Sequence, residues 1–125
     1  FLICSADIPP SCKIGKNVLF AHWGLGVVLN EVVELQDNVI IYQHVTIGRS
    51  RGIDDRNPER LRRIVIGENT LIGANAVILA KREELIIGCN CEIGAGALVI
   101  DDVPDNMIAI GVPAICKPRG ETHGP

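Results

Sequence analysis

The sequence predicts an all-β solenoid, in which the chain winds into stacked coils of three short strands each. The main evidence is a repeat of aliphatic or aromatic residues, because nine of the twelve steps between them are six residues long. Neither a helix nor a flat alternating strand has this period, whereas a coil that uses about six residues for each strand and turn does. The repeated residues are Ile8, Ile14, Phe20, Val27, Val33, Val39, Val45, Ile66, Ile72, Ile78, Ile87, Ile93 and Val99.

Glycines and small residues follow the same repeat. Seven of the thirteen glycines come directly after an isoleucine, which glycines scattered through loops would not do. Small residues recur four positions after the large ones, where the corners of a triangular prism leave little room; they are Cys12, Val18, Thr70, Ala76, Cys91 and Ala97. Coils stacked about 4.8 Å apart would pair their backbone groups. We interpret all these residues as scaffold.

Composition restricts the function classes. The 125 residues fit one domain, which we place at 1–117 with a tail at 118–125. The net charge of −3 and the lack of a basic cluster argue against a nucleic-acid partner. No apolar run approaches the roughly 20 residues of a membrane span, and no secretory leader is visible. The chain does not begin with Met, so the sequence leaves open whether a segment precedes Phe1.

The five cysteines do not suggest a metal site or a disulfide framework. Their number is odd, and Cys89-Asn90-Cys91 is spaced too tightly for the usual arm of a zinc site. Cys12 and Cys91 also occupy the small corner positions of the repeat. We therefore expect free thiols, no bound metal and a reducing, cytoplasmic compartment.

Three segments interrupt the repeat, and interruptions of a regular scaffold are where function is usually added. The first, 21–26, has one residue more than the repeat requires. The second, 49–63, is too polar for a prism, so we expect an exposed loop there. The third, 80–85, adds three residues. After Val99 the repeat ends, and later prolines prevent its return.

Several motifs stand out along the chain: Asp7-Ile8-Pro9-Pro10, His22-x-x-x-Gly26-Val27-Val28, Tyr42-Gln43-His44-Val45-Thr46-Ile47-Gly48, Asp55-Arg56-Asn57-Pro58, Ile93-Gly94-Ala95-Gly96-Ala97 and the ending Gly111-Val112-Pro113-Ala114. Together they resemble the bacterial serine acetyltransferases, a family of hexapeptide-repeat acyltransferases. The resemblance covers about 7–117. It implies a left-handed parallel β-helix, a homotrimer and acetyl-CoA as cosubstrate. The handedness rests on the resemblance alone, because parallel crossovers elsewhere are right-handed in about 98% of cases.

His22 is the candidate general base. Moving an acetyl group from a thioester to a hydroxyl requires removal of the hydroxyl proton, and a neutral imidazole is suited to that role near pH 7. Asp7 lies 15 residues earlier, slightly less than one coil, so its carboxylate would reach the imidazole from the neighbouring coil and stabilise the imidazolium. In the resembling family the equivalent residues form this dyad. The alternatives are a surface histidine at a turn and an aspartate that shapes the chain entry.

The other two histidines carry weaker predictions. His44 precedes an inward valine, and we consider a contact with the acceptor. His123 lies in a Gly- and Pro-rich tail, where we expect no role. Three histidines on a β-helix also suggest the zinc site of γ-class carbonic anhydrases, but the spacing of His22, His44 and His123 does not reproduce it. We therefore expect no metal.

For coenzyme A, the resemblance points to a seam between two prisms, lined by Gly48, Ala74 and Ala95. Corner packing explains these small residues equally well. Lys117 and Arg119 follow the Gly-Val-Pro-Ala ending and would meet the phosphates of the cofactor, unless they are simply solvated cations of a tail.

The acceptor is less well defined than the reaction. Arg56 matches the family residue expected to bind the carboxylate of serine, and a guanidinium binds a carboxylate through two hydrogen bonds. Asn57, however, stands where the family usually carries histidine. We therefore expect acetyl-CoA-dependent O-acetyl transfer to L-serine, with a sugar hydroxyl as the alternative. A non-catalytic assembly scaffold is the alternative from another class.

Overall fold

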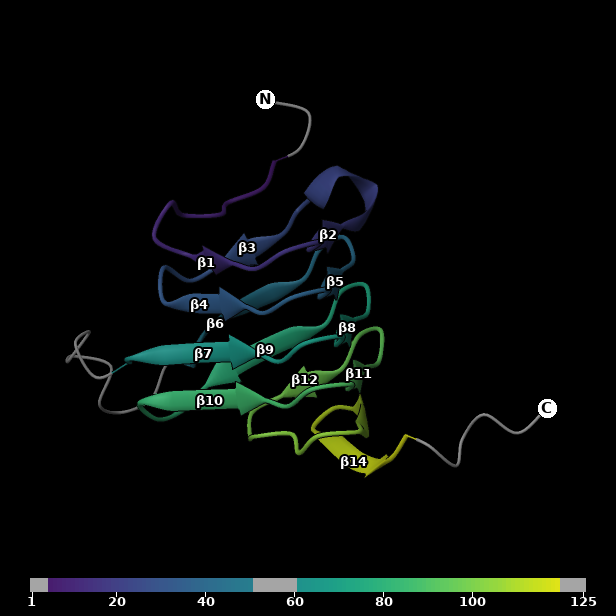
Figure 1. Cartoon of the computed structure of the whole chain (residues 1–125). Coiled ribbons are helices and arrows are strands. Elements are labelled where there is room, and N and C mark those ends of the chain that lie inside the picture. Colours follow the sequence, from purple (N-terminus) through teal and green to yellow (C-terminus); the bar gives the residue numbers. More distant parts are fainter. Residues whose placement is uncertain (1–4, 51–60, 120–125) are drawn as a thin grey trace.

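The computed structural model describes residues 5–50 and 61–119, and it winds as stacked coils from the N-terminal end to the C-terminal end (Figure 1). The coils build three sheets whose strands run parallel from coil to coil, apart from one antiparallel pair at the C-terminal end. This confirms the predicted all-β solenoid. Within the described ranges, no helix is long and apolar enough to cross a membrane.

Each sheet collects one strand from each coil. The first sheet contains β1 (Lys13–Ile14), β4 (Val33–Leu35), β7 (Arg63–Ile66) and β10 (Glu84–Ile87). The second contains β2 (Leu19–Phe20), β5 (Ile40–Ile41), β8 (Leu71–Ile72), β11 (Glu92–Ile93), β13 (Met107–Gly111) and β14 (Ala114–Pro118). The third contains β3 (Val28–Leu29), β6 (Thr46–Arg49), β9 (Val77–Ala80) and β12 (Leu98–Val99), and the short helix η1 (Ala21–Gly24) lies between β2 and β3.

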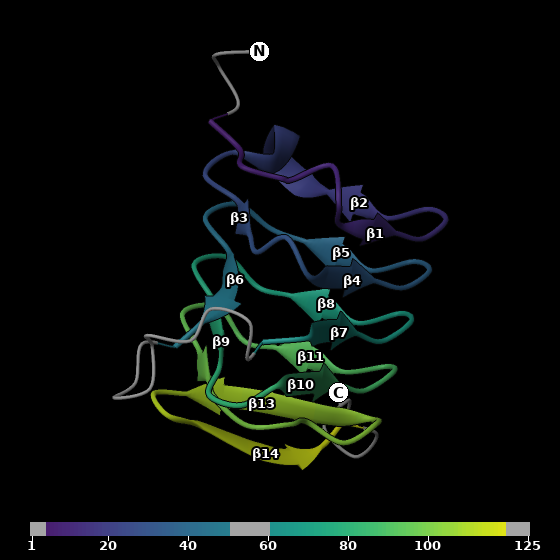
Figure 2. The ribbon, with the colours of Figure 1, turned by 90° about the vertical axis from the view of Figure 1, so that its left-hand side faces the viewer.

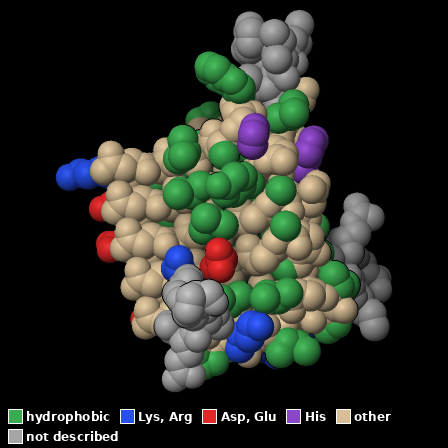
Figure 3. Space-filling model, turned by 90° about the vertical axis from the view of Figure 1, so that its right-hand side faces the viewer, with side chains coloured by type: hydrophobic (Ala, Val, Ile, Leu, Met, Phe, Trp, Pro, Cys, Tyr) green, Lys and Arg blue, Asp and Glu red, His purple; other side chains and the backbone are tan. Residues whose placement is uncertain are grey.

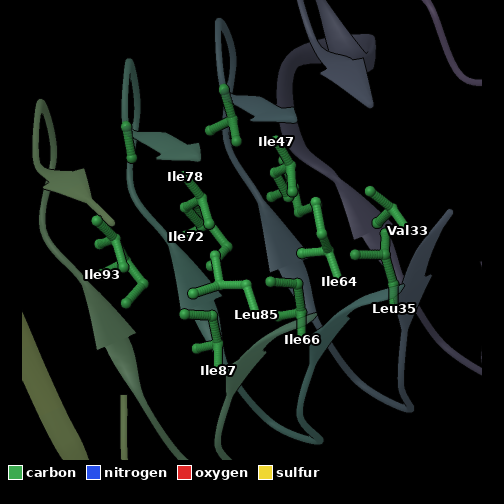
Figure 4. Packing of buried hydrophobic residues seen from close by; sticks show 14 of the residues in the cluster. Val33, Leu35, Ile47, Ile64, Ile66, Ile72, Ile78, Leu85, Ile87 and Ile93 are labelled. Carbon is green, nitrogen blue, oxygen red and sulfur yellow. The ribbon is translucent and has the colours of Figure 1, made fainter. Parts of the chain in front are cut away.

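The core is a column of aliphatic side chains enclosed by the three sheets (Figure 4). Strand pairing stacks equivalent residues directly over one another, as in the series Leu35, Ile66 and Ile87. Each of these side chains is at most 1% exposed. Ile14, which pairs with Leu35 from the outermost coil, is 43% exposed. The prism therefore excludes water most completely in its inner coils.

The pairing corrects the predicted repeat between Val27 and Val45. Phe20 pairs with Ile41, and Leu29 pairs with Ile47. The large inward side chains of this part are therefore Leu29, Leu35, Ile41 and Ile47. Val27, Val33, Val39 and Val45 are buried at the small corner positions instead. The segment from Phe20 to Leu29 takes nine residues where its neighbour takes six, so the first interruption adds three residues rather than one.

The ends of the two later interruptions also differ from the prediction. Arg49 belongs to β6, Leu61 is buried in the core and Arg63 belongs to β7, so the solenoid includes both ends of the predicted loop 49–63. Ala80 ends β9 and Glu84 begins β10, which reduces the third excursion to 81–83.

Four of the six predicted small corners are tightly packed, and the other two, Cys12 and Val18, are partly buried. Thr70, Ala76, Cys91 and Ala97 are at most 1% exposed. The Thr70 hydroxyl donates to the backbone oxygen of Gly88 at 2.8 Å and accepts from the backbone N–H of Cys91 at 3.1 Å. It therefore ties its own coil to the next. Cys12, Cys89, Cys91 and Cys116 are all free thiols.

A hairpin that the sequence did not predict closes the C-terminal end. β13 pairs parallel with β11 on one side and antiparallel with β14 on the other. Figure 2 shows the two strands lying across the end of the stack. β14 runs to Pro118. The last residue of the predicted domain, 117, and the first residue of the predicted tail, 118, therefore both lie in the hairpin.

Candidate active site

One corner of the coil is built from unusual backbone. Ten described residues other than glycine have positive φ, and six of them are asparagines, which tolerate this conformation. Three of the other four, His22, Trp23 and His44, follow β2 or β5 at the same corner. Backbone of this kind costs free energy and tends to gather at functional sites.

Strand pairing shows which residues share this corner. Phe20, Ile41, Ile72 and Ile93 occupy equivalent places in successive coils. The triplets that follow them are Ala21-His22-Trp23, Tyr42-Gln43-His44, Gly73-Ala74-Asn75 and Gly94-Ala95-Gly96. The first two triplets carry large polar and aromatic side chains, whereas the last two are small. Along one edge of the prism, the corner thus carries polar and aromatic side chains in the first two coils and a stripe of small residues, Gly73-Ala74 and Gly94-Ala95-Gly96, in the next two.

His22 lies in η1 and is exposed. Its backbone is left-handed, with φ 54° and ψ 40°, and its carbonyl accepts the N–H of Leu25 at 3.2 Å. The centroid of its ring is 6.3 Å from that of Tyr42, and the two ring planes are inclined by 48°. The predicted base is therefore open to solvent and to a substrate.

Asp7 lies on the strand position next to β3, where it forms a parallel bridge with Val28. Its N–H donates to the Val27 oxygen at 2.8 Å, and its own carbonyl accepts the N–H of Leu29 at 2.9 Å. Its neighbour Ala6 borders η1, because a β-carbon added at Gly24 would be 3.8 Å from that of Ala6.

The structure places Asp7 beside the coil of His22 but does not join the two side chains. Within residues 5–50 and 61–119, neither a hydrogen bond nor an ion pair links the carboxylate to the imidazole. Hydrogen bonds of catalytic groups are often long before substrate binds and shorten in the reacting complex. The Asp7–His22 dyad stays a prediction.

His44 brings a second imidazole to the corner. The backbone N–H of His44 donates to the Leu25 oxygen at 2.8 Å, and the His44 ring lies against the α-carbon of Gly26. It occupies the left-handed corner position that Asn75 and Gly96 hold in later coils. Figure 3 shows the two described histidine side chains near the N-terminal end of one face, with apolar side chains below them. Arg56, Asn57 and His123 lie outside the described residues.

Tyr42 and Gln43 belong to the corner, although the sequence reasoning did not assign them a role. The Oε1 atom of Gln43 is buried and has no hydrogen-bond partner in the described part of the chain. Buried acceptors are almost always paired, so this atom marks the corner as unusual. The available signal was the replacement of the Gly-Ala pairs of later coils by Tyr42-Gln43.

The residues predicted for coenzyme A lie on the second and third sheets and at the corner between them. Ala74 and Ala95 are in the small triplets of the corner, and Gly48 is in β6. A β-carbon added at Gly48 or Gly96 would meet nothing within 4 Å, so open space lies over both. Lys117 is exposed in β14. From β5 to β14 the sheet advances four strand spacings, about 19 Å. The described residues hold no group of three or more His, Cys, Asp or Glu arranged to bind a metal ion.

No protein-family model matches the chain. It is 42% identical over 113 residues to a probable serine acetyltransferase of Oryza sativa, covering 90% of this chain and 34% of that protein. It is 39% identical over 122 residues to the serine acetyltransferase of Staphylococcus aureus, covering 94% and 52%. The chain thus spans about half the length, or less, of these relatives.

Solved structures show the same likeness. The serine acetyltransferase of Neisseria gonorrhoeae in complex with serine superposes with a TM-score of 0.72 and 37% identity, covering 88% of this chain and 41% of that one. A serine acetyltransferase in complex with CoA superposes with a TM-score of 0.74 and 31% identity, covering 90% and 41%. The three parallel sheets agree with the left-handed β-helix that the sequence resemblance implied.

Proposed function

We propose, from the premise that this chain is a homologue of the serine acetyltransferases in the hexapeptide-repeat acetyltransferase family, that it transfers the acetyl group of acetyl-CoA to the hydroxyl of L-serine. The observation that carries the proposal is the exposed imidazole of His22, held on left-handed backbone at a corner that also contains Tyr42 and His44. This corner joins the small-residue stripe of the later coils.

The chemistry follows from the imidazole. Neutral His22 takes the hydroxyl proton as the acceptor oxygen attacks the thioester carbonyl. The carbon–sulfur bond then breaks, and the imidazolium returns the proton to the departing thiolate. The Asp7 carboxylate, on the adjacent strand position, would close on the imidazole when substrates bind and stabilise its positive charge. His44 would contact the acceptor.

The stripe of small residues fits the acyl donor. The side chains of Ala74 and Ala95 are small, so they do not project far from the corner. The open space over Gly48 allows a ligand to lie against the backbone. Lys117 would meet the phosphates from β14. The guanidinium of Arg119 already donates to the Asn90 carbonyl at 3.0 Å, so Lys117 is the better candidate of the two cations.

A homotrimer would complete this seam with the face of a second prism. Apolar side chains point outward along the third sheet, where Val28, Val77 and Leu98 are aligned through strand pairing with Thr46. Val28 is 41% exposed and Trp23 is 86% exposed in the single chain. Sedimentation of the active protein checks the assembly, and a stable, active monomer would contradict it.

Release of free thiol from acetyl-CoA tests the function directly. The assay compares L-serine with other amino acids, sugars and nucleotide-sugars, and we expect L-serine to be the best acceptor. Asn57, in place of the family's histidine, favours a sugar hydroxyl as the second candidate. Asn57→His should raise activity toward L-serine. Unchanged serine activity together with rapid turnover of a sugar would favour the second candidate.

Calorimetry separates the enzyme from a non-catalytic scaffold, since a scaffold would not bind acetyl-CoA.

We also propose that the protein works in the cytoplasm. The free thiols of Cys12, Cys89, Cys91 and Cys116 support this compartment, because thiols stay reduced there.

A further inference from the structure

We infer that Tyr42 is a positioning residue for His22, whose aromatic ring limits the orientations of the imidazole and holds it ready for proton transfer. The inference rests on the proposed function of His22 as the general base. Tyr42 follows β5, one coil away from His22 along the same corner.

The first observation is the ring contact itself. The centroids are 6.3 Å apart with the planes inclined by 48°, a separation typical of aromatic pairs. In the described part of the chain, no hydrogen bond to the imidazole opposes its rotation. His22 is exposed on a short helical turn, so the Tyr42 ring is the neighbour that restricts its movement on this side.

The second observation is the identity of the equivalent residues. Gly73 and Gly94 stand at the position of Tyr42 in the next two coils. The chain therefore turns this corner without a side chain there. The backbone of Tyr42 pairs as the others do, with its N–H donating to the Ile72 oxygen at 3.0 Å. The ring is thus dispensable for the coil, and its contact with His22 gives it a role.

The physical effect is on the reacting geometry rather than on binding. An imidazole that samples several orientations spends part of its time away from the acceptor hydroxyl, and small misplacements of a reacting group are costly. This effect comes from the ring, so the phenol hydroxyl is not required.

Steady-state kinetics of three variants tests the inference. Tyr42→Phe should keep kcat within about 2-fold of the parent protein. Tyr42→Leu and Tyr42→Gly should each lower kcat by roughly 10- to 100-fold, with the KM for acetyl-CoA nearly unchanged. Because glycine occupies this position in later coils, Tyr42→Gly should fold normally, and its circular dichroism and melting temperature check this. Undiminished kcat in Tyr42→Leu, or an equal loss in Tyr42→Phe, would overturn the inference.

A matched control and a second readout make the test specific. Ile86→Ala removes a partly buried side chain from β10, on a different sheet, and should leave kcat unchanged. The proton chemical shifts of the His22 imidazole should move in Tyr42→Leu and stay in place in Tyr42→Phe, because the aromatic ring shifts them. This readout needs no turnover. If the parent protein acetylated no acceptor, the proposed function would fail while the contact would still be tested.

Discussion

The imidazole of His44 lies over the α-carbon of Gly26, so closely that a β-carbon on Gly26 would overlap the ring. Gly26 also has φ +68°, a conformation that side chains rarely adopt. The position of one candidate site residue thus depends on the absence of a side chain from another residue. Two features therefore require glycine at position 26 of the His22-x-x-x-Gly26 motif: the nearby His44 ring and the positive φ of its own backbone.

Gly26→Ala should destabilise the fold and displace His44. Gly96→Ala is the matched control, since Gly96 has φ +72° but open space around it. The control should lose about 1–2 kcal/mol from backbone strain alone. Gly26→Ala should lose at least about 1 kcal/mol more, because the His44 ring must move. Denaturant unfolding measures both, and equal losses would show that the ring moves without cost.

His22→Ala should lower kcat by roughly 10²–10⁴-fold, the usual contribution of general base catalysis. Affinity for acetyl-CoA should hardly change, because the imidazole acts on the acceptor hydroxyl. Asp7→Asn should lower the same parameter by less. Kinetics together with calorimetry of acetyl-CoA binding checks both variants. Near-normal turnover of His22→Ala would refute its assignment as the base.

Thr70→Val should destabilise the protein by about 1–3 kcal/mol, because the Gly88 oxygen and the Cys91 N–H both lose their buried partner. Thr70→Ser keeps the hydroxyl and should lose less. Urea unfolding of the two variants gives the comparison. If Val proved the milder change, the hydroxyl would not be what joins these coils.

The buried thiol of Cys91 should make stability depend on pH in alkaline solution. Burial raises the pKa of Cys91 above its ordinary 9.0, so the unfolded chain releases this proton before the folded one does. The contribution of Cys91 to stability is therefore fully present below pH 9 and is lost as the pH rises through the folded pKa. Unfolding in urea between about pH 8 and 10.5 should show a flatter decline for Cys91→Ala. Cys116→Ala, at an exposed position of β14, should keep the original slope.

The sequence contained the fold class and the corner residues because the prism repeats one steric requirement in every coil. The repeat does not identify the inward residues between Val27 and Val45, because valine fits both the corner and the core position. Only strand pairing distinguishes the two positions. At the candidate site, His22 and His44 could be proposed from the sequence because imidazoles are chemically distinctive. Tyr42 was missed because its role depends on a contact between coils that spacing alone does not reveal.

The hairpin of β13 and β14 gives the molecule a finite length. Every coil of the stack pairs parallel with its neighbour, so a terminal coil would leave an edge on which an identical coil can be added. β14 runs against that direction and ends at Pro118, which has no N–H to donate. A second molecule therefore cannot continue the parallel ladder of the second sheet from β14. The reversal of one strand therefore works against end-to-end growth into fibres.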